Sequence, residues 1–100
     1  MAPSNNLLDF TGLKAVIPEH VLFQDLDGEA VLLDVQTGGY FGLNSVGTLV
    51  WQLLAEGKSV GEVISEICGH YEIGEAQAMS DTRAFVSALE QQSLIFLSHE

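Results

Sequence analysis

The stretch Gly38–Trp51, which reads GGYFGLNSVGTLVW, decides the fold of this chain. Its two leading glycines predict a turn, because glycine readily adopts the positive φ angles that tight turns need. Tyr40–Leu43 then reads as a short strand. Asn44 is typical of a helix N-cap, and the apolar residues after it recur at helical spacing. The stretch joins a strand tightly to an amphipathic helix and contains no catalytic motif, which favours a small binding module over an enzyme.

Two further strands are predicted upstream, where the apolar pattern has a period near two. They are Val21–Gln24 and Glu29–Val35, and the hairpin signal Asp27–Gly28 separates them. With Tyr40–Leu43 they form an antiparallel meander in which Glu29–Val35 is central. Side chains alternate between the two faces of a strand. The main apolar face of the central strand is therefore predicted to consist of Val31, Leu33 and Val35, and Leu32 and Tyr40 are expected on the opposite face.

Three helices are predicted downstream, where the apolar spacing becomes helical. The first is capped by Asn44 and stops at Gly57, and the second begins with the capping box Ser59–Glu62. The third covers about residues 75–92, and a short apolar segment, 94–97, follows as a last strand or a docked tail. Neither half of such a chain can bury its apolar face alone. The expected fold class is therefore α+β, with an N-terminal three-stranded antiparallel sheet packed on a three-helix bundle.

The expected organisation is one domain with loose ends. A chain of 100 residues is long enough for a single core. No regular pattern precedes Pro18, so residues 1–17 are expected to form a flexible N-terminal arm. The domain then spans residues 18–97, and residues 98–100 form a C-terminal tail.

The composition argues against several classes of partner. Only 3 basic residues face 14 acidic ones, and a net charge of −11 repels the phosphates of nucleic acids. No apolar run approaches the roughly 18 residues of a membrane span. Cys68 is the single cysteine, which excludes a disulfide scaffold and favours a reducing compartment. With no secretory signal at the N-terminus, a cytoplasmic protein is expected.

No constellation of residues predicts chemistry. The histidines His20, His70 and His99 do not stand at ligand spacing, and Cys68-Gly69-His70 has no second pair to complete a zinc site. The glycines around Tyr40 lie between two strands and not before a helix, which indicates a turn instead of a phosphate loop. We therefore expect no enzyme, no metal and no cofactor.

The last strand of the sheet and the third helix form the candidate binding surface. The edge Tyr40–Leu43 carries no lysine, proline or bulge as a guard, so an extended peptide can add there as a fourth strand. Phe41 and Leu43 are expected to face one way and Tyr40 the other. Beside this edge, small and acidic residues of the third helix leave a trough suited to a peptide with basic residues. The alternative is that the same alanines pack closely against the sheet. The helical residues in question are Asp81, Ala84, Phe85, Ala88 and Gln91.

Residues 18–97 resemble the PqqD family. The resemblance is carried by Val31–Asp34, Gly39–Asn44, Val50–Trp51 and Asp81–Val86, among others. Members of that family are peptide chaperones with a winged helix-turn-helix fold, and they act as recognition elements for ribosomally made, post-translationally modified peptides (RiPPs). The leader segment of the precursor pairs with the third strand and lies against the third helix. The edge and the trough together give the expected peptide-binding residues Gly39, Tyr40, Phe41, Gly42, Leu43, Asp81, Ala84, Phe85, Ala88 and Gln91.

The resemblance also implies partners. A PqqD-like chain presents its precursor peptide to a modifying enzyme such as a radical SAM protein or a protease, in pyrroloquinoline quinone (PQQ) biosynthesis, lasso-peptide clusters or related systems. A homodimer through the edge strand or the N-terminal arm is a further expectation. The alternative function is a winged-helix DNA-binding regulator, and it is disfavoured because Arg83 is the one basic residue of the third helix.

Overall fold

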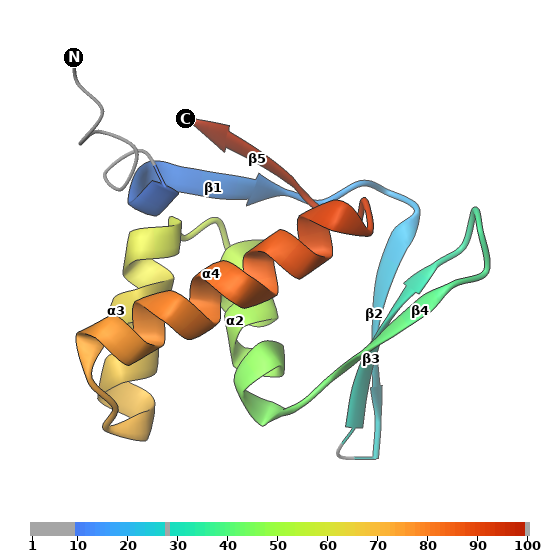
Figure 1. The fold of residues 1–100 in the computed structure, drawn as a ribbon. Coiled ribbons are helices and arrows are strands. Elements are labelled where there is room, and N and C mark those ends of the chain that lie inside the picture. The colour runs from blue at the N-terminus through green and yellow to red at the C-terminus, as the bar shows by residue number, and fades with distance from the viewer. Residues whose placement is uncertain (1–9, 28, 100) are drawn as a thin grey trace.

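The computed structural model describes residues 10–27 and 29–99. Figure 1 shows the larger sheet beside the helices, with a second, two-stranded ribbon above them. This order confirms the expected α+β, winged helix-turn-helix-like fold. The elements are β1 (Leu13–Val16), β2 (Val21–Leu26), β3 (Glu29–Asp34), β4 (Tyr40–Leu43), α2 (Ser45–Ala55), α3 (Val60–Tyr71), α4 (Glu75–Gln91) and β5 (Phe96–His99).

The larger sheet has the strand order β2-β3-β4, with both pairs antiparallel. The face of β3 that meets the core is not the main apolar face that the sequence pattern indicated. Leu32 is fully buried and pairs across the sheet with Phe41, whereas Val35 is 59% exposed. The expectation that Tyr40 shares the face of Leu32 was wrong, because Tyr40 pairs with Leu33 and lies on the exposed face with it. Both faces of β3 are apolar, so the period-two pattern defines two faces without saying which one packs on the helices.

A side-chain hydrogen-bond network fixes the turn between β3 and β4. The Asp34 carboxylate accepts hydrogen bonds from the backbone N–H groups of Gln36 at 2.9 Å and Thr37 at 3.2 Å. Gly38 has a φ of 81°, as the glycine pair predicted. The Thr37 hydroxyl accepts from the N–H of Gly39 at 3.1 Å. The start of β4 is therefore held in place by its own turn.

The predicted helix caps are present. Asn44 follows β4 directly, and its side-chain oxygen accepts from the N–H of Gly47 at 2.7 Å. Ser59 and Glu62 form the reciprocal capping box at the start of α3. Gly57 has a φ of 96° just after α2, as expected of a glycine that ends a helix. No linker separates β4 from α2, so the edge strand is rigidly attached to the bundle.

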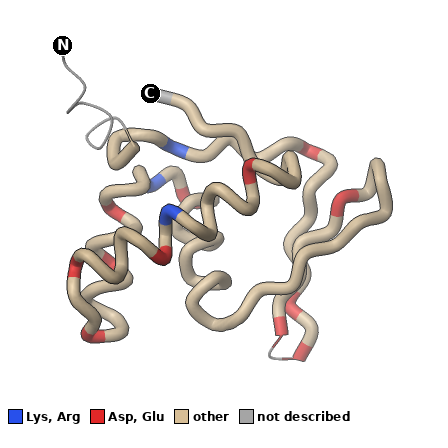
Figure 2. The backbone as a smooth tube through the Cα atoms, in the orientation of Figure 1, with Lys and Arg blue, Asp and Glu red and all other residues tan. Residues whose placement is uncertain are grey.

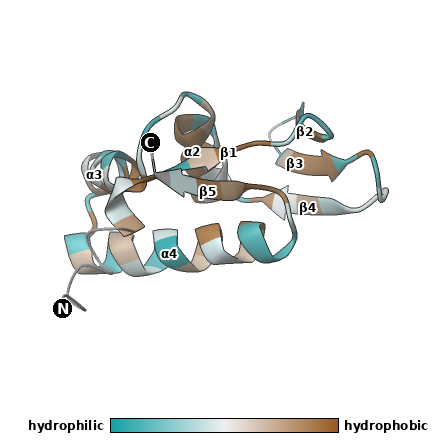
Figure 3. Ribbon diagram, turned by 90° about the horizontal axis from the view of Figure 1, so that it is seen from above, coloured by the Kyte–Doolittle hydropathy of each residue, from teal (hydrophilic) through white to brown (hydrophobic). Residues whose placement is uncertain are grey.

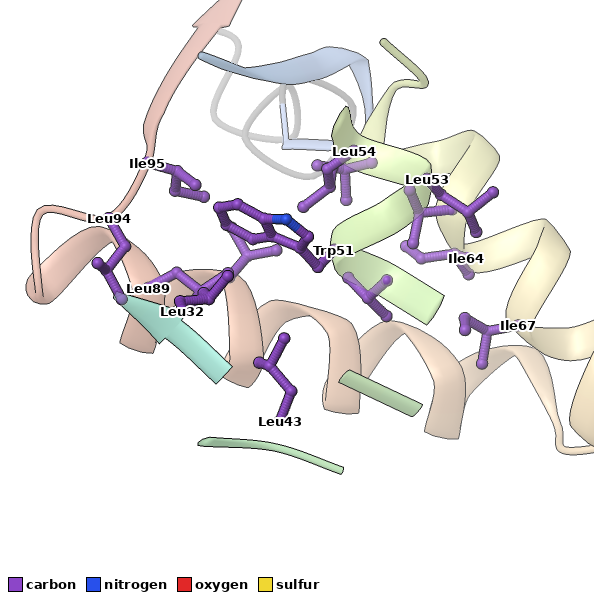
Figure 4. Packing of buried hydrophobic residues seen from close by; sticks show 14 of the residues in the cluster. Leu32, Leu43, Trp51, Leu53, Leu54, Ile64, Ile67, Leu89, Leu94 and Ile95 are labelled. Carbon is purple, nitrogen blue, oxygen red and sulfur yellow. The ribbon is translucent and has the colours of Figure 1, made fainter. Parts of the chain in front are cut away.

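One core joins the sheet to the helices. Trp51 of α2 is 3% exposed, and Figure 4 places it between Leu32 of β3, Leu54 of α2 and Ile95 beyond α4. On α4 the buried side chains come from one face, which includes Ala78, a residue the sequence pattern did not single out. The core residues are Phe10, Val21, Ala30, Leu32, Leu43, Val50, Trp51, Leu53, Leu54, Val60, Val63, Ile64, Ile67, Ala78, Val86, Leu89, Leu94 and Ile95.

The two ends of the described chain pair with each other. β1 is antiparallel to β5, with Leu13 opposite His99 and Val16 opposite Phe96. Residues 13–16 therefore differ from the loose arm expected over residues 1–17, and residue 98 belongs to a strand instead of a tail. The partner of β1 lies at the far end of the sequence, where no local pattern points to it. Residues 1–9, also part of the expected arm, lie outside the described residues, as does Gly28 of the predicted hairpin.

Candidate functional site

β4 is an edge strand with an accessible main chain. Within residues 10–27 and 29–99, β3 is the one strand that pairs with it. The N–H of Asp34 donates to the carbonyl of Gly39 at 2.9 Å. Main-chain groups alternate in direction along an antiparallel strand, so Phe41 and Leu43 also turn theirs toward β3. The N–H and C=O groups of Tyr40 and Gly42 consequently point away from β3, and we call this side of β4 the open edge.

The side chains of β4 divide as predicted. Leu43 is buried and Phe41 is partly buried, both on the face that meets the helices, whereas Tyr40 is 76% exposed on the other face. A strand paired with the open edge would continue this alternation. Every second side chain of such a strand would point toward the helices, and the others would point away from them.

α4 forms the wall beside the open edge. The rings of Phe41 and Phe85 meet edge to face, with their centroids 6.2 Å apart. Ala84 is exposed and Ala88 is partly exposed, so the sheet does not bury the face that they share. The opposite face of α4, with Thr82, carries the buried residues. In the view of Figure 3, β4 lies toward the C-terminal end of α4, and the contact of Phe41 with Phe85 joins the two elements. These alanines therefore do not pack closely against the sheet. We call the surface formed by β4, Phe85 and this exposed face of α4 the groove between β4 and α4.

Two hollows flank the contact between Phe41 and Phe85. The larger has a volume of about 410 Å³ and lies between α4, the start of α2 and the end of α3. The smaller, of about 80 Å³, lies where β4 meets the end of α4 and has Phe41, Tyr40 and Gln92 in its wall. The larger hollow is mainly apolar, and its wall includes Val46, Val50, Ile67, Tyr71, Ile73 and Phe85. Sequence reasoning missed it because the three helices that form it contribute only a few residues each.

Gly47 allows Phe85 to take its place in the groove. A Cβ atom at Gly47 would lie 3.2 Å from Cε1 of Phe85 and 3.2 Å from the capping oxygen of Asn44. A glycine in the first turn of a helix is otherwise unfavourable. This mid-pattern glycine was the one available sequence signal for a close contact at the start of α2.

The charges are distributed unevenly around the groove. In Figure 2 the Lys and Arg positions, coloured blue, lie on the side of the molecule away from the β2-β3-β4 sheet. The Arg83 guanidinium stacks 4.4 Å from the centre of the Phe10 ring. Asp81 borders the larger hollow and accepts a hydrogen bond from the Gln77 amide at 2.9 Å. The walls of the two hollows contain acidic but no basic side chains, so the groove favours a ligand that is neutral or positive.

Other kinds of site find no support in the part of the chain that the structure describes. It contains no group of three or more side chains placed to hold a metal ion. None of its helices is long and apolar enough to cross a lipid bilayer. Cys68 is a free, partly buried thiol. The groove between β4 and α4 is thus the candidate site.

Comparison with known proteins identifies the family. The family model for coenzyme PQQ synthesis protein D (PqqD) matches residues 29–95. The chain belongs to the PqqD family. The match begins with β3 and runs past α4, so the PqqD-type region includes both walls of the groove. No curated protein sequence gave a significant match.

Two solved structures resemble this PqqD-family chain over most of its length. The first is TbiB1 in complex with the TbiA(beta) leader peptide, which is 40% identical with a TM-score of 0.74 and covers 79% of this chain and 92% of TbiB1. The second is lasso peptide synthetase B1 complexed with the leader peptide, which is 26% identical with a TM-score of 0.78. That match covers 83% of this chain and 98% of the synthetase chain. The family expected from the sequence is confirmed, whereas the roles of the individual groove residues stay predictions.

Proposed function

We propose that this chain is a non-enzymatic adaptor that binds the leader segment of a ribosomally made precursor peptide. The observation that carries the proposal is the open edge of β4, which lies beside Phe85 in a chain 40% identical to a protein solved with a leader peptide. Strand addition to such an edge obtains affinity from main-chain hydrogen bonds and specificity from pockets for alternate side chains.

The leader lies antiparallel to β4 and bonds to the N–H and C=O groups of Tyr40 and Gly42. Its inward side chains enter the groove between Phe41 and Phe85, and an apolar side chain fills part of the 410 Å³ hollow. The bordering Asp81 suits a basic residue of the leader. The proposed contact residues are Gly39, Tyr40, Phe41, Gly42, Leu43, Asp81, Ala84, Phe85, Ala88 and Gln91.

The adaptor presents the rest of the precursor to a modifying enzyme, such as a radical SAM protein or a protease, in the cytoplasm. A homodimer that paired β4 with itself would occupy the same open edge, so leader binding and self-pairing compete. The net charge of −11 opposes the approach of two copies, which favours the leader as the occupant.

A titration of the isotope-labelled chain with the TbiA(beta) leader peptide tests the proposal. We expect amide chemical-shift changes concentrated in Gly39–Leu43 and residues 81–91, with slowed hydrogen exchange at Tyr40 and Gly42, whose N–H groups become bonded. Shifts confined to the ribbon of β1 and β5 would contradict the proposed groove. No shift at all, with this leader or with that of the lasso synthetase complex, would overturn leader binding.

A further inference from the structure

The face of the β2-β3-β4 sheet that points away from the helices is unusually apolar for this acidic chain. We call it the outer face. Leu22 is 43% exposed, Val35 is 59% exposed and Tyr40 is 76% exposed. Leu22, Leu33 and Tyr40 stand in one cross-strand row, because Leu33 pairs with both of the others. Among the residues that the structure describes, no element covers this row, and Figure 1 shows the helices on the other side of the sheet.

The neighbouring row contains a gap. It consists of Gln24, Val31 and Gly42, since Val31 pairs with both of the others. Gly42 has no side chain, and a Cβ atom added there would meet nothing within 4 Å. The gap is bordered by Tyr40 along β4 and by the partly buried Val31 across the sheet. It therefore opens directly at the edge where a leader strand would add.

Strand geometry determines what reaches this gap. Residues directly opposite each other in a sheet point their side chains to the same face. A leader residue opposite Gly42 therefore points its side chain to the outer face. With no side chain at Gly42 in the way, a large side chain can lean across β4 onto Val31 and Tyr40. An aromatic cross-strand neighbour that covers a glycine in this manner stabilises a sheet.

We infer that Gly42 is a specificity-determining position, and that the leader residue paired with it carries a large apolar or aromatic side chain that packs over Gly42 between Tyr40 and Val31. The leader is then recognised on both faces of the sheet, with inward residues against Phe85 and this outward residue over Gly42. The inference rests on the proposed function, because it needs a leader strand on β4. Tyr40 and Val31, which border the gap, are uncharged, and the carboxylate of Glu29 lies next to Val31 along the same face of β3, which disfavours an acidic leader side chain there.

Double-mutant cycles between the protein and the leader test this inference. Each residue of the TbiA(beta) leader is replaced in turn by alanine, and the dissociation constants are measured with the full chain. The protein variants are Gly42→Gln, which fills the gap with a polar side chain, Gly42→Ala as its matched control, and Phe85→Ala for the inner side. All three keep the main-chain groups of β4, and the Cβ atom that both Gly42 substitutions add meets nothing within 4 Å in the free protein.

We expect one large apolar leader residue whose alanine replacement weakens binding about fivefold to wild type and to Gly42→Ala, but less than twofold to Gly42→Gln. The same leader replacement should weaken binding to Phe85→Ala by the same factor as it weakens binding to wild type. Nuclear Overhauser contacts from that residue to the Val31 methyl groups should accompany it. If every sensitive leader residue couples to Phe85 and none to Gly42, the inference is wrong while leader binding stands. If the leader does not bind wild type, both are overturned.

Discussion

A proline at Gly42 separates leader binding from folding, because of the direction in which the Gly42 main chain points. Its N–H faces the open edge, so Gly42→Pro removes a donor for the leader and none for β3. Proline is tolerated in edge strands when the missing N–H would face solvent. Phe41, which precedes it, already has the extended conformation that proline requires of its neighbour.

The expected loss of affinity follows from that one donor. A leader carbonyl left without a partner costs about 1–3 kcal/mol, and the proline ring also obstructs the approach of the strand. We therefore expect the dissociation constant to rise about ten- to hundredfold. The free energy of unfolding should change by less than about 1 kcal/mol, because no bond to β3 is lost. Phe41→Pro, one residue away, removes a bond to β3 and the contact with Phe85, and should destabilise the fold by about 3 kcal/mol.

The assay is fluorescence anisotropy with a labelled TbiA(beta) leader, together with urea unfolding of each variant. Gly42→Ala is the matched control, since it keeps the N–H, and its affinity should stay within about threefold of wild type. A folded Gly42→Pro protein that binds the leader as tightly as Gly42→Ala would refute strand addition on β4.

Three further predictions concern the groove and the cap of α3. Phe85→Ala removes the inner wall and should weaken leader binding by about 2 kcal/mol, measured by calorimetry, and an unchanged affinity would exclude the groove. Gly47→Ala forces the Phe85 ring to move, so leader affinity should fall severalfold, although alanine favours the helix. Tighter leader binding would show that the close contact of Gly47 with Phe85 does not matter for the groove. The Ser59 N–H holds the pKa of Glu62 below its ordinary value of 4.5. The stabilisation that this lowering supplies is present above that pH and is lost as pH falls through the lowered pKa. In Glu62→Gln, the free energy of unfolding measured with urea should depend less on pH in this range. A pH dependence identical to that of wild type would show that the Glu62 charge does not contribute to stability.

Local signals in the sequence predicted the elements of the site well. The glycine turn, the β4 strand, the Asn44 cap and the Ser59 capping box each depend on residues within a few positions of one another, and each is present. The placement of the Phe41 and Tyr40 side chains on opposite faces of β4 also follows from strand alternation alone. These predictions are correct because local backbone geometry determines each of these features.

Features that depend on distant partners could not be predicted in the same way. Which face of β3 is buried depends on where the helices pack, and both of its faces are apolar. The pairing of β1 with β5 joins residues at opposite ends of the chain. The larger hollow needs α2, α3 and α4 together, so Tyr71 and Ile73 gave no sign of lining it. A single sequence records the periodicity of each element but not the neighbour that it meets.

The ribbon of β1 and β5 has a practical consequence for protein engineering. Because Leu13 lies opposite His99, β1 begins and β5 ends at the same end of the ribbon. A linker from His99 back to Phe10, which has to be kept because it is buried in the core, would close the chain into a ring. New termini could be placed at the exposed bend around Gly57. A fusion partner attached after β5 would be held by the ribbon and not by β4, and would leave the open edge free.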